Sequence, residues 1–440
     1  MTPSAVRECD QTDKRDELDL IDLTVKKFTR PQLRVNEALL RRELTTITGV
    51  KESMLRKLGV DKETLMSDIK FQQLLIDRGL TKDKVPMKWS EAQLKQVPTF
   101  AKVSGDFLKL LDNPEYAPYV EARLAHKSTL EESRIERLLG IVSKAGPMLS
   151  IPLRYYGAHT GRFSGDGKIN LQNLPRKSVI RTAMEAPPGY LCISADLAQI
   201  EARITATLAE QNDLVRQFAD GKDVYCLFAS EFYKRTITKA DERERFIGKT
   251  AILSLGFGAS SAKFEATMND VFHTPVTDTE ANAIVKLYRR RYHKIPQLWR
   301  VMDGMIYAMQ LGVTKELGPL VTGKRKVILP NGMPIFYPEL VNGEYKSGKL
   351  RVKLYGAKFL ENVVQALARI VMTTAELRLA RHRLFAALSI HDELLFVVKE
   401  DHAELISGVV KAVLEEPVAW MPKLPIAVEV KIGRNYGECK

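Results

Sequence analysis

Apolar residues recur at two spacings along the chain, and each spacing predicts one kind of element. Short apolar runs predict strands, and they occur in GYLCISAD (189–196), ALSI (387–390), LLFVV (394–398) and IAVEVKIG (426–433). Spacings of three and four residues predict helices, and they occur in QIEARITATLAE (199–210), KFLENVVQALARIVMTTAEL (358–377) and EDHAELISGVVKAVLEE (400–416). The order strand, helix, hairpin, helix, strand favours an antiparallel sheet covered by helices on one face. The pattern therefore predicts an α+β fold whose sheet is split in sequence.

Helical and irregular segments are expected around this sheet. Residues 37–139 are mainly helical in pattern and strongly basic, and LIDLTVKKF (20–28) before them predicts a short helix. Turn-like clusters of Gly and Pro in residues 153–188 predict irregular backbone. From about Ala219 we expect a mostly helical insertion, which closes with the turn-rich segment ILPNGMPIFYPE (328–339).

The composition limits the class of protein. A chain of 440 residues is long enough for several lobes, and 45% hydrophobic with 28% charged residues excludes wholesale disorder. The net charge of +13 favours a polyanionic partner, which leaves nucleic acid and a membrane surface open. No apolar run approaches the ~18–20 residues of a membrane span, and the N-terminus lacks a signal core or a transit peptide. Four widely spaced cysteines fit neither a zinc site nor a disulfide scaffold. We therefore expect a soluble, intracellular protein that meets nucleic acid.

Two acidic residues stand at the ends of predicted strands. Asp196 closes GYLCISAD, and Asp392 lies in the trio HDE at the tip of the predicted hairpin. Two carboxylates brought together repel each other unless a divalent cation bridges them. Oxygen ligands without a His or Cys cluster favour Mg²⁺ over zinc. The alternative, which the local pattern leaves open, is that Asp196 caps the next helix and Asp392 is a turn residue.

A second group of residues lies in ERERFIGKTAILSLGFG (242–258). Arg245, Lys249, Leu253 and Phe257 recur every four residues and form one stripe on a predicted helix. Two cations followed by apolar residues could hold a triphosphate and stack on a base. The alternative is a surface helix with solvated cations.

Two further segments carry polar side chains suited to nucleic acid. The irregular segment HTGRFSGDGKINLQNLPR (159–176) presents planar donors that suit minor-groove edges and phosphates, namely Arg162, Asn170, Gln172, Asn173 and Arg176. The helix at 358–377 has a polar stripe of Lys358, Glu361, Gln365 and Arg369 beside its apolar one. Each feature also has an ordinary explanation, because Asn and Arg are common in loops and most polar stripes face solvent.

Jointly and in this order, the segments resemble the polymerase portion of the family A DNA polymerases (the DNA polymerase I family), most closely its short bacteriophage-type members. DLAQIEAR (196–203) and HDE (391–393) are similar to the two palm motifs. Arg245, Lys249, Phe257 and Gly258 match the fingers-helix motif. One primer–template motif is matched by TGRFS (160–164) with NLQNLPR (170–176), and a second by GAKFLENVVQALAR (356–369). KSTLEESRIERLL (127–139) resembles the junction that leaves the thumb. The resemblance covers nearly all of residues 20–440.

The resemblance implies a right-hand architecture: an antiparallel-sheet palm, helical fingers and a helical thumb. The implied divisions are an N-terminal segment 1–36 (a linker remnant without a nuclease domain), a thumb 37–150, a first palm part 151–215, fingers 216–339 and a second palm part 340–440. Asp10, Asp13, Asp16 and Glu17 lie in the N-terminal segment. We expect no 3′→5′ exonuclease in this chain, because a segment of that length cannot hold a nuclease fold.

The resemblance also implies the chemistry and its residues. Asp196 and Asp392 match the carboxylates that bind two Mg²⁺ ions, with Mn²⁺ as a possible substitute. The backbone carbonyl of Leu197 is expected to assist them, and Glu393 matches an auxiliary carboxylate. Lys249 is also placed to protonate the departing pyrophosphate, and Glu201 matches the residue that blocks a ribose 2′-hydroxyl. The remaining nucleotide-site positions are Arg181, Gln199, Tyr225, Arg245, Leu253 and Phe257. Tyr225 stands where the family commonly has histidine, and Leu253 where it usually has an aromatic residue. The primer–template matches are Lys127 on the thumb, Arg162, Asn170, Gln172, Asn173, Gln365 and His391.

The function that follows is template-directed DNA synthesis with primer–template DNA and deoxynucleoside triphosphates as partners, in a bacterial cytoplasm or a phage-infected host cell. The alternatives are a reverse transcriptase, a single-subunit RNA polymerase or, from another class, an inactive DNA-binding scaffold. A separate exonuclease or processivity subunit is a possible further partner. Phe257 departs from the family, which usually has tyrosine there, and the missing hydroxyl would leave Glu201 less well oriented.

Overall fold

The computed structural model describes residues 3–91, 93–102, 104–167, 169–272 and 274–439, with side chains from Arg15 onward except that of Asp270. The chain forms two compact units. The larger unit consists of Met1–Arg34, Met148–Arg176 and Met184–Lys440, and the smaller of Val35–Pro147 and Lys177–Ala183. Helices and antiparallel sheets occur together in the chain, which confirms the predicted α+β class.

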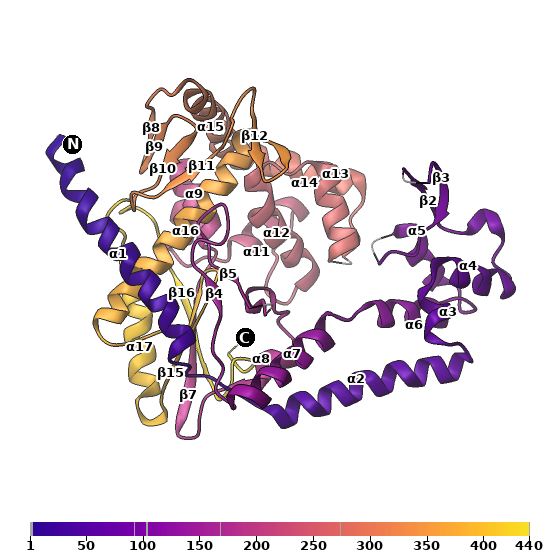
Figure 1. The fold of residues 1–440 in the computed structure, drawn as a ribbon. Coiled ribbons are helices and arrows are strands. Elements are labelled where there is room, and N and C mark those ends of the chain that lie inside the picture. The colour runs from indigo at the N-terminus through magenta and orange to yellow at the C-terminus, as the bar shows by residue number, and fades with distance from the viewer. Residues whose placement is uncertain (1–2, 92, 103, 168, 273, 440) are drawn as a thin grey trace. The chain divides into compact units, whose positions relative to one another are not determined.

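The centre of the larger unit is a four-stranded antiparallel sheet (Figure 1). Its strands, in spatial order, are β14 (Leu388–Ile390), β15 (Glu393–Lys399), β7 (Tyr190–Leu197) and β16 (Val428–Gly433). β7 lies between β15 and β16, and five of its eight residues are buried, as expected for a central strand. All four strands were predicted from apolar runs, and the structure confirms them.

Three helices pack against this sheet or against one another. They are α9 (Ile200–Leu208), α16 (Gly356–Arg381) and α17 (Ala403–Leu414). α17 contacts β7, β15 and β16, and α16 contacts both α9 and α17. Most residues of α16 are buried, which is typical of a helix surrounded by other elements rather than lying at a surface.

The insertion between the two parts of the sheet begins with helices, as predicted. These are α10 (Asn212–Ala219), α11 (Val224–Tyr233), α12 (Glu242–Ser254), α13 (Ser261–Ala266), α14 (Asp278–Arg291) and α15 (Lys294–Leu311). Strands that the sequence analysis did not predict follow them: β8 (Glu316–Leu317), β9 (Leu320–Gly323), β10 (Lys326–Ile328) and β11 (Pro334–Phe336) in one antiparallel sheet, and a hairpin of β12 (Glu344–Ser347) and β13 (Leu350–Lys353). The expectation of turns at 328–339 was therefore incomplete, because strands of two to four residues carry too few alternating positions to give a signal.

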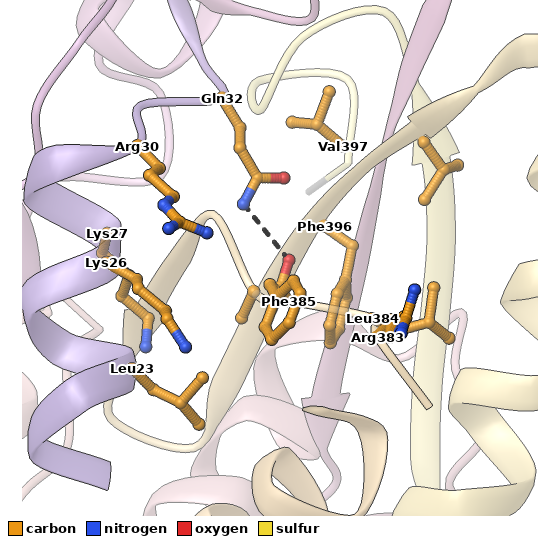
Figure 2. Close-up of a pocket in the computed structure, with 12 residues that line it drawn as sticks. Leu23, Lys26, Lys27, Arg30, Gln32, Arg383, Leu384, Phe385, Phe396 and Val397 are labelled. Carbon is orange, nitrogen blue, oxygen red and sulfur yellow. Dashed lines mark hydrogen bonds between the residues drawn. The ribbon is translucent and has the colours of Figure 1, made fainter. Parts of the chain in front are cut away.

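The first helix is longer than the sequence analysis predicted. α1 spans Pro3–Thr29, whereas the apolar spacing predicted a helix at 20–28 alone. Leu20 and Leu23 are buried against Leu377 of α16. Just after the end of α1, the Gln32 amide donates to the carbonyl oxygen of Phe385, in the segment before β14, at 3.4 Å (Figure 2). The predicted part of the helix, at 20–28, is thus the part that holds these apolar contacts with the rest of the unit.

The predicted irregular region between residues 153 and 188 contains short elements. They are β4 (Leu153–Arg154), which pairs with β5 (Ser164–Gly165), the 3₁₀-helix η3 (Leu171–Asn173), α8 (Val179–Ala183) and β6 (Met184–Glu185). None exceeds five residues, so most of this region takes its conformation from its surroundings.

The smaller unit is mainly helical. Its elements include α2 (Glu37–Leu58), α3 (Lys62–Met66), α4 (Asp68–Asp77), β2 (Met87–Ser90), β3 (Lys95–Pro98), α5 (Gly105–Leu108), α6 (Ala117–Lys127) and α7 (Leu130–Ala145), with α8. The β2–β3 hairpin was not predicted. In the core, the rings of Phe71 and Phe100 meet edge to face at 4.9 Å, and Arg123 is fully buried above both. Within the described residues, no helix is long and apolar enough to cross a membrane.

Candidate active site

The two predicted metal-binding aspartates meet at one edge of the central sheet. Asp196 is the seventh of the eight residues of β7, and Asp392 lies in the turn between β14 and β15. The Leu197 amide donates to the Asp392 carbonyl oxygen at 3.0 Å, which joins the two segments directly. His391 has a φ of +49°, and this left-handed conformation allows the tight turn that carries Asp392.

The electrostatics of this edge show that the two carboxylates are neighbours. Desolvation and then the charge of Asp196 raise the pKa of Asp392 to about 7. Arg162 and Glu201 also act on this carboxyl group, so all four side chains share one environment. An acidic pair of this kind, with oxygen donors, has the chemistry that suits a hard divalent cation.

Glu393 is directly opposite Asp196 in the sheet, but hydroxyl groups hold its carboxylate. Ser194 Oγ donates to one oxygen of Glu393, and Tyr436 Oη donates to the other at 2.8 Å. Glu393 and Tyr436 are both buried. These bonds direct the carboxylate into the protein, and its predicted role as an auxiliary metal ligand stays a prediction.

Gln172 holds the hairpin that carries Asp392. Its amide nitrogen donates to the Ser389 carbonyl oxygen at 2.8 Å, and its amide oxygen accepts from the His391 backbone nitrogen at 3.2 Å. Gln172 is buried, and both ends of its amide are occupied by backbone groups of the hairpin. Its predicted contact with primer–template DNA stays a prediction, while its observed contacts are structural.

The turn after β7 positions Glu201 on the first turn of α9. Gln199 begins this helix in a left-handed conformation, with a φ of +50°, and its amide oxygen accepts from Arg203 at 3.2 Å. Arg203 is buried and also donates to the Ala198 carbonyl oxygen at 2.7 Å, which pins the turn. The Glu201 carboxylate forms an ion pair with Arg162. The structure thus brings together two residues that were predicted for different substrates, the nucleotide sugar and the primer terminus.

Cationic side chains on α12 form another part of the site. Arg245 Nε donates to Asp223 at 2.9 Å, and its guanidinium lies 5.4 Å from the centre of the Tyr225 ring. Desolvation and then the neighbouring cations Arg176 and Arg245 lower the pKa of Lys249. Asp196 acts on Lys249 as well, so this lysine and the acidic edge share one electrostatic environment.

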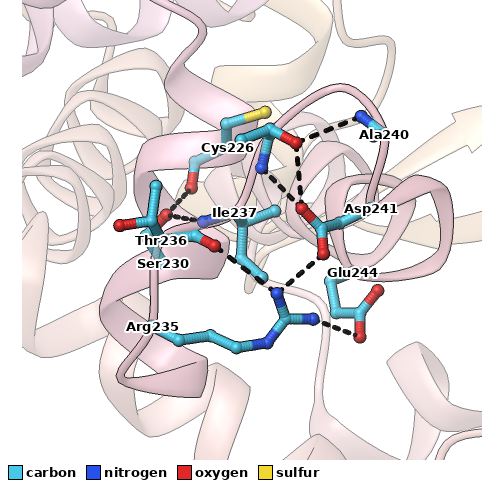
Figure 3. A network of polar contacts seen from close by, with 9 residues as sticks. Cys226, Ser230, Arg235, Thr236, Ile237, Ala240, Asp241 and Glu244 are labelled. Atoms are coloured by element: carbon cyan, nitrogen blue, oxygen red, sulfur yellow. Dashed lines mark hydrogen bonds and ion pairs between the residues drawn. The ribbon is translucent and has the colours of Figure 1, made fainter.

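The orientation of α12 depends on its junction with α11. Arg235, in the connecting loop, donates to Asp241 at 2.7 Å and to Glu244 at 2.9 Å (Figure 3). Asp241 precedes the first residue of α12, so these bonds fix where the helix begins. A Cβ atom at Gly248 would lie 2.3 Å from the Tyr225 carbonyl oxygen, and only glycine permits this approach of α11 to α12.

The predicted stripe of four residues does not continue on one α-helix. Arg245, Lys249 and Leu253 lie on α12, whereas Phe257 lies on the 3₁₀-helix η4 (Leu255–Phe257). The change from 3.6 to three residues per turn alters the direction of Phe257. Leu253 and Phe257 are partly buried and pack against the core of the larger unit.

The other predicted residues have varied surroundings. Gln365 on α16 accepts from Thr160 Oγ1 at 3.5 Å, beside the segment that holds Arg162. The Asn170 side chain accepts from the Gln172 backbone nitrogen at 3.0 Å and caps η3, and Asn173 is exposed. Their roles toward DNA stay predictions.

Lys127 and Arg181 belong to the smaller unit. Lys127 Nζ donates to the Phe100 carbonyl oxygen at 2.8 Å, and Arg181 on α8 is buried. Their predicted roles in binding DNA and nucleotide stay predictions.

Some residues of the site had no role in the sequence analysis. Asp223 orients Arg245 and caps α11, and an Asp directly before a helix is a recognisable signal. Ser194 and Tyr436 carry no such signal, because each meets Glu393 only through the tertiary structure.

Comparison with known proteins identifies the fold of this chain and the family to which it belongs. The fold is similar to that of the POL domain of Pol1 from M. smegmatis, in a structure with DNA primer-template and dNTP: the TM-score is 0.69 at 21% identity, over 93% of this chain and 68% of that one. The fold is therefore that of a polymerase domain. The sequence profile of DNA polymerase family A matches residues 36–311, and the chain belongs to this family.

Two curated relatives show how much of a polymerase the chain covers. Thermostable DNA polymerase I of Thermus filiformis is 26% identical over 329 residues, which are 73% of this chain and 37% of the relative. The DNA polymerase of Bacillus phage SP02 is 24% identical over 443 aligned positions, covering 85% of this chain and 67% of the relative. The chain thus spans little more than a third of the bacterial relative and two thirds of the phage relative.

Proposed function

We propose that this chain is a template-directed DNA polymerase, which adds deoxynucleotides to the 3′-hydroxyl of a primer. The observation that carries the proposal is the meeting of Asp196 and Asp392 at one edge of the central sheet, with the Leu197–Asp392 backbone hydrogen bond between them. Membership of family A and the likeness to a polymerase domain support the same activity.

The acidic edge fits a two-ion magnesium site. Asp196 and Asp392 would hold the ions, with help from the Leu197 carbonyl oxygen and with Glu393 as the auxiliary carboxylate. Within the described residues, no three His, Cys, Asp or Glu side chains gather around a common metal position, so water and substrate oxygens would supply the other ligands. Bound there, Mg²⁺ (or Mn²⁺ in its place) would lower the pKa of the primer hydroxyl and neutralise the triphosphate.

The cationic residues act on the nucleotide. Arg245, oriented by Asp223, and Lys249 bind the triphosphate in this proposal. The lowered pKa of Lys249 makes it a better proton donor to the departing pyrophosphate at neutral pH. Glu201 excludes the ribose 2′-hydroxyl, and its ion pair with Arg162 supplies an orienting contact that Phe257 cannot give.

The right-hand division is part of the proposal. The palm comprises 151–215 and 340–440, the fingers 216–339 and the thumb 37–150. The separation of Val35–Pro147 as part of a compact unit of its own supports a distinct thumb.

Primer extension with Mg²⁺ tests the proposal. We expect the parent to extend a DNA primer on a DNA template, and Asp392→Ala to lose extension by at least about 10³-fold while it still binds primer–template. Asp401→Ala, which changes an exposed carboxylate in the same unit, is the matched control and should extend normally. Equal extension by the parent and Asp392→Ala would reject the site. An RNA template, and ribonucleotides in place of deoxynucleotides, separate the reverse-transcriptase and RNA-polymerase alternatives.

The same reactions test for exonuclease activity, which we propose is absent from this chain. Asp16 pairs with Arg381 and Glu17 with Arg369, so both carboxylates have structural partners. The side chains of Asp10 and Asp13 lie outside the described ones. A 3′-labelled primer incubated without deoxynucleotides should stay intact, and degradation abolished by substituting these acids would contradict the proposal.

A further inference from the structure

A buried ion pair joins α1 to the long helix α16. The Glu17 carboxylate accepts from Arg369 Nη1 at 2.6 Å and from Nη2 at 2.9 Å, which is the two-point geometry of a strong arginine–carboxylate pair. Tyr155 Oη and Asn331 Nδ2, the latter at 2.5 Å, also donate to this carboxylate. Burial alone would raise the pKa of Glu17, but these donors, led by Arg369, lower it, so Glu17 stays ionised at neutral pH.

Arg369 connects this ion pair to the segment that carries Arg162. The centre of its guanidinium lies 5.6 Å from the Tyr155 ring, 5.2 Å from the Tyr156 ring and 5.7 Å from the Phe163 ring. An arginine over aromatic faces fixes the rings as well as itself. The three rings flank the turn in which the Gly161 amide donates to the Ala158 carbonyl oxygen at 2.9 Å.

The turn packs closely against one of these rings. Gly161 has a φ of +78°, and a Cβ atom there would lie 2.6 Å from Cζ of Tyr156. The Ala158 amide donates to the Arg162 carbonyl oxygen at 3.1 Å, so the backbone of Arg162 belongs to the same turn. The position of Arg162 therefore depends on Tyr156, which Arg369 holds.

A second buried ion pair connects α1 to the other side of the site. Lys27 Nζ donates to Glu376 of α16 at 2.5 Å, and the side chains of both residues are almost fully buried. The Ser389 hydroxyl donates to the same Glu376 carboxylate at 3.4 Å. Ser389 is the middle residue of β14, the strand that leads into the turn with His391 and Asp392.

We propose that α1 is a positioning element of the active centre: Glu17 fixes Arg162 through Arg369, and Lys27 fixes the Asp392 hairpin through Glu376. The inference rests on the proposed function for the roles of Arg162 and Asp392. It assigns to α1 a part in primer engagement and catalysis that a linker would not have. The two ion pairs act on different steps, so their loss has different kinetic consequences.

Steady-state primer extension, well below the melting temperature of each variant, tests the first ion pair. Glu17→Gln should raise the KM for primer–template about tenfold and leave the KM for the deoxynucleotide within about twofold. Asp16→Asn is the matched control, since Asp16 precedes Glu17 on α1 and forms an exposed pair with Arg381 at 3.0 Å, and both constants should stay unchanged. Glu17→Asp, which keeps the charge, should recover part of the loss.

A double-mutant cycle separates positioning from general destabilisation. If Glu17 acts through Arg162, then Glu17→Gln should cause no further loss in an Arg162→Ala background. Losses that multiply, or an equal rise in both KM values, would overturn the inference.

For the second ion pair, Lys27→Met should lower kcat several-fold, while the KM for primer–template should stay within about twofold of the parent value. An unchanged kcat would contradict this part of the inference.

Two further measurements keep the inference open to refutation. If Glu17→Gln does not fold, Tyr155→Phe removes one donor to Glu17 and keeps the ring, and it should raise the KM for primer–template in the same direction; no change would count against the inference. Amide hydrogen exchange of residues 154–163 does not depend on activity. Protection there should fall in the Glu17→Gln protein, and unchanged protection would overturn the inference. A parent protein that extends no primer would instead reject the proposed function, and the exchange measurement would still test the inference.

Discussion

At the scale of single residues, the site is governed by charges that the fold places close together. Asp392 lies beside Asp196, and Glu201 is paired with Arg162. Two neighbouring carboxylates that are partly shielded from water raise the free energy of the folded protein when both are ionised. The arrangement therefore costs stability, which agrees with the proposal that these groups bind a cation.

The first prediction concerns the stability cost of Asp392. Its pKa is raised from 3.8 to about 7, so the folded protein binds this proton more tightly than the unfolded chain does. The free energy of unfolding should therefore fall as the pH rises through this interval. In the presence of a chelator, we expect Asp392→Asn to have a higher Tm than the parent at pH 8, with a smaller difference at pH 5. Thermal unfolding followed by circular dichroism measures both.

The control for this prediction is Asp401→Asn, which changes an exposed carboxylate. It should leave the Tm difference between pH 5 and pH 8 as in the parent. Mg²⁺ added at pH 8 should raise the Tm of the parent more than that of Asp392→Asn. Equal Tm values of Asp392→Asn and the parent at pH 8 would show that ionising Asp392 costs the folded protein nothing, which would contradict its raised pKa.

At the scale of elements, the nucleotide side of the site depends on how closely two helices approach. Gly248 of α12 faces the Tyr225 carbonyl of α11, and the same approach brings Asp223 to Arg245. The sequence places Gly248 between the two cations, so one helical turn combines residues proposed to bind the triphosphate with a packing residue. The spacing of the helices and the orientation of Arg245 are thus coupled.

The second prediction follows from this coupling. Gly248→Ala would place a Cβ atom 2.3 Å from the Tyr225 carbonyl oxygen, which forces α11 and α12 apart. We expect a loss of stability of about 1–3 kcal/mol, measured by urea unfolding. The KM for the deoxynucleotide should also rise, because Arg245 separates from Asp223.

Gly408→Ala is the matched control for this substitution. Gly408 lies on α17, and a Cβ atom there meets no other atom within 4 Å. This variant should be neutral or more stable by about 0.5–1 kcal/mol, since alanine favours the helix. If Gly248→Ala matched this control, the close approach of α11 and α12 would not constrain the fold.

At the scale of the whole molecule, the charge balance favours nucleic acid. The net charge is +13, and the larger unit presents Arg245, Lys249 and Arg176 around the acidic edge. A basic protein gains affinity for DNA mainly by releasing the counterions that surround the phosphates. The acidic edge is thus a local exception within a cationic protein.

The third prediction concerns the salt dependence of DNA binding. If the chain neutralises about six or more phosphates, its affinity for primer–template should fall by about 10³-fold between ~50 mM and ~200 mM salt. Fluorescence anisotropy with a labelled duplex measures this dependence. An Asp392→Ala variant should show the same slope, because the substitution removes no cation. A slope near zero would reject phosphate contacts as the main source of affinity.

The sequence by itself determined the central strands, most of the helices and the family. Alternating and three-to-four spacings depend on residues near one another in sequence, so β7, β15, β16, α9, α16 and α17 could be predicted. The short motifs around Asp196, Lys249 and Asp392 were visible for the same reason, since each is a local string of residues. The short strands β8–β11 and the N-terminal half of α1 gave no such signal.

The tertiary structure alone decided which of these side chains face one another. Gln172 holds the Asp392 hairpin across 217 residues, Glu17 pairs with Arg369 across 352, and Ser194 reaches Glu393 across 199. No local pattern encodes such pairs. An arginine on a predicted helix looks the same in the sequence whether its side chain is buried against a partner or exposed to solvent. Their partners are set by how the helices and the sheet pack, and burial of a charge is tolerated only where packing supplies its counter-charge.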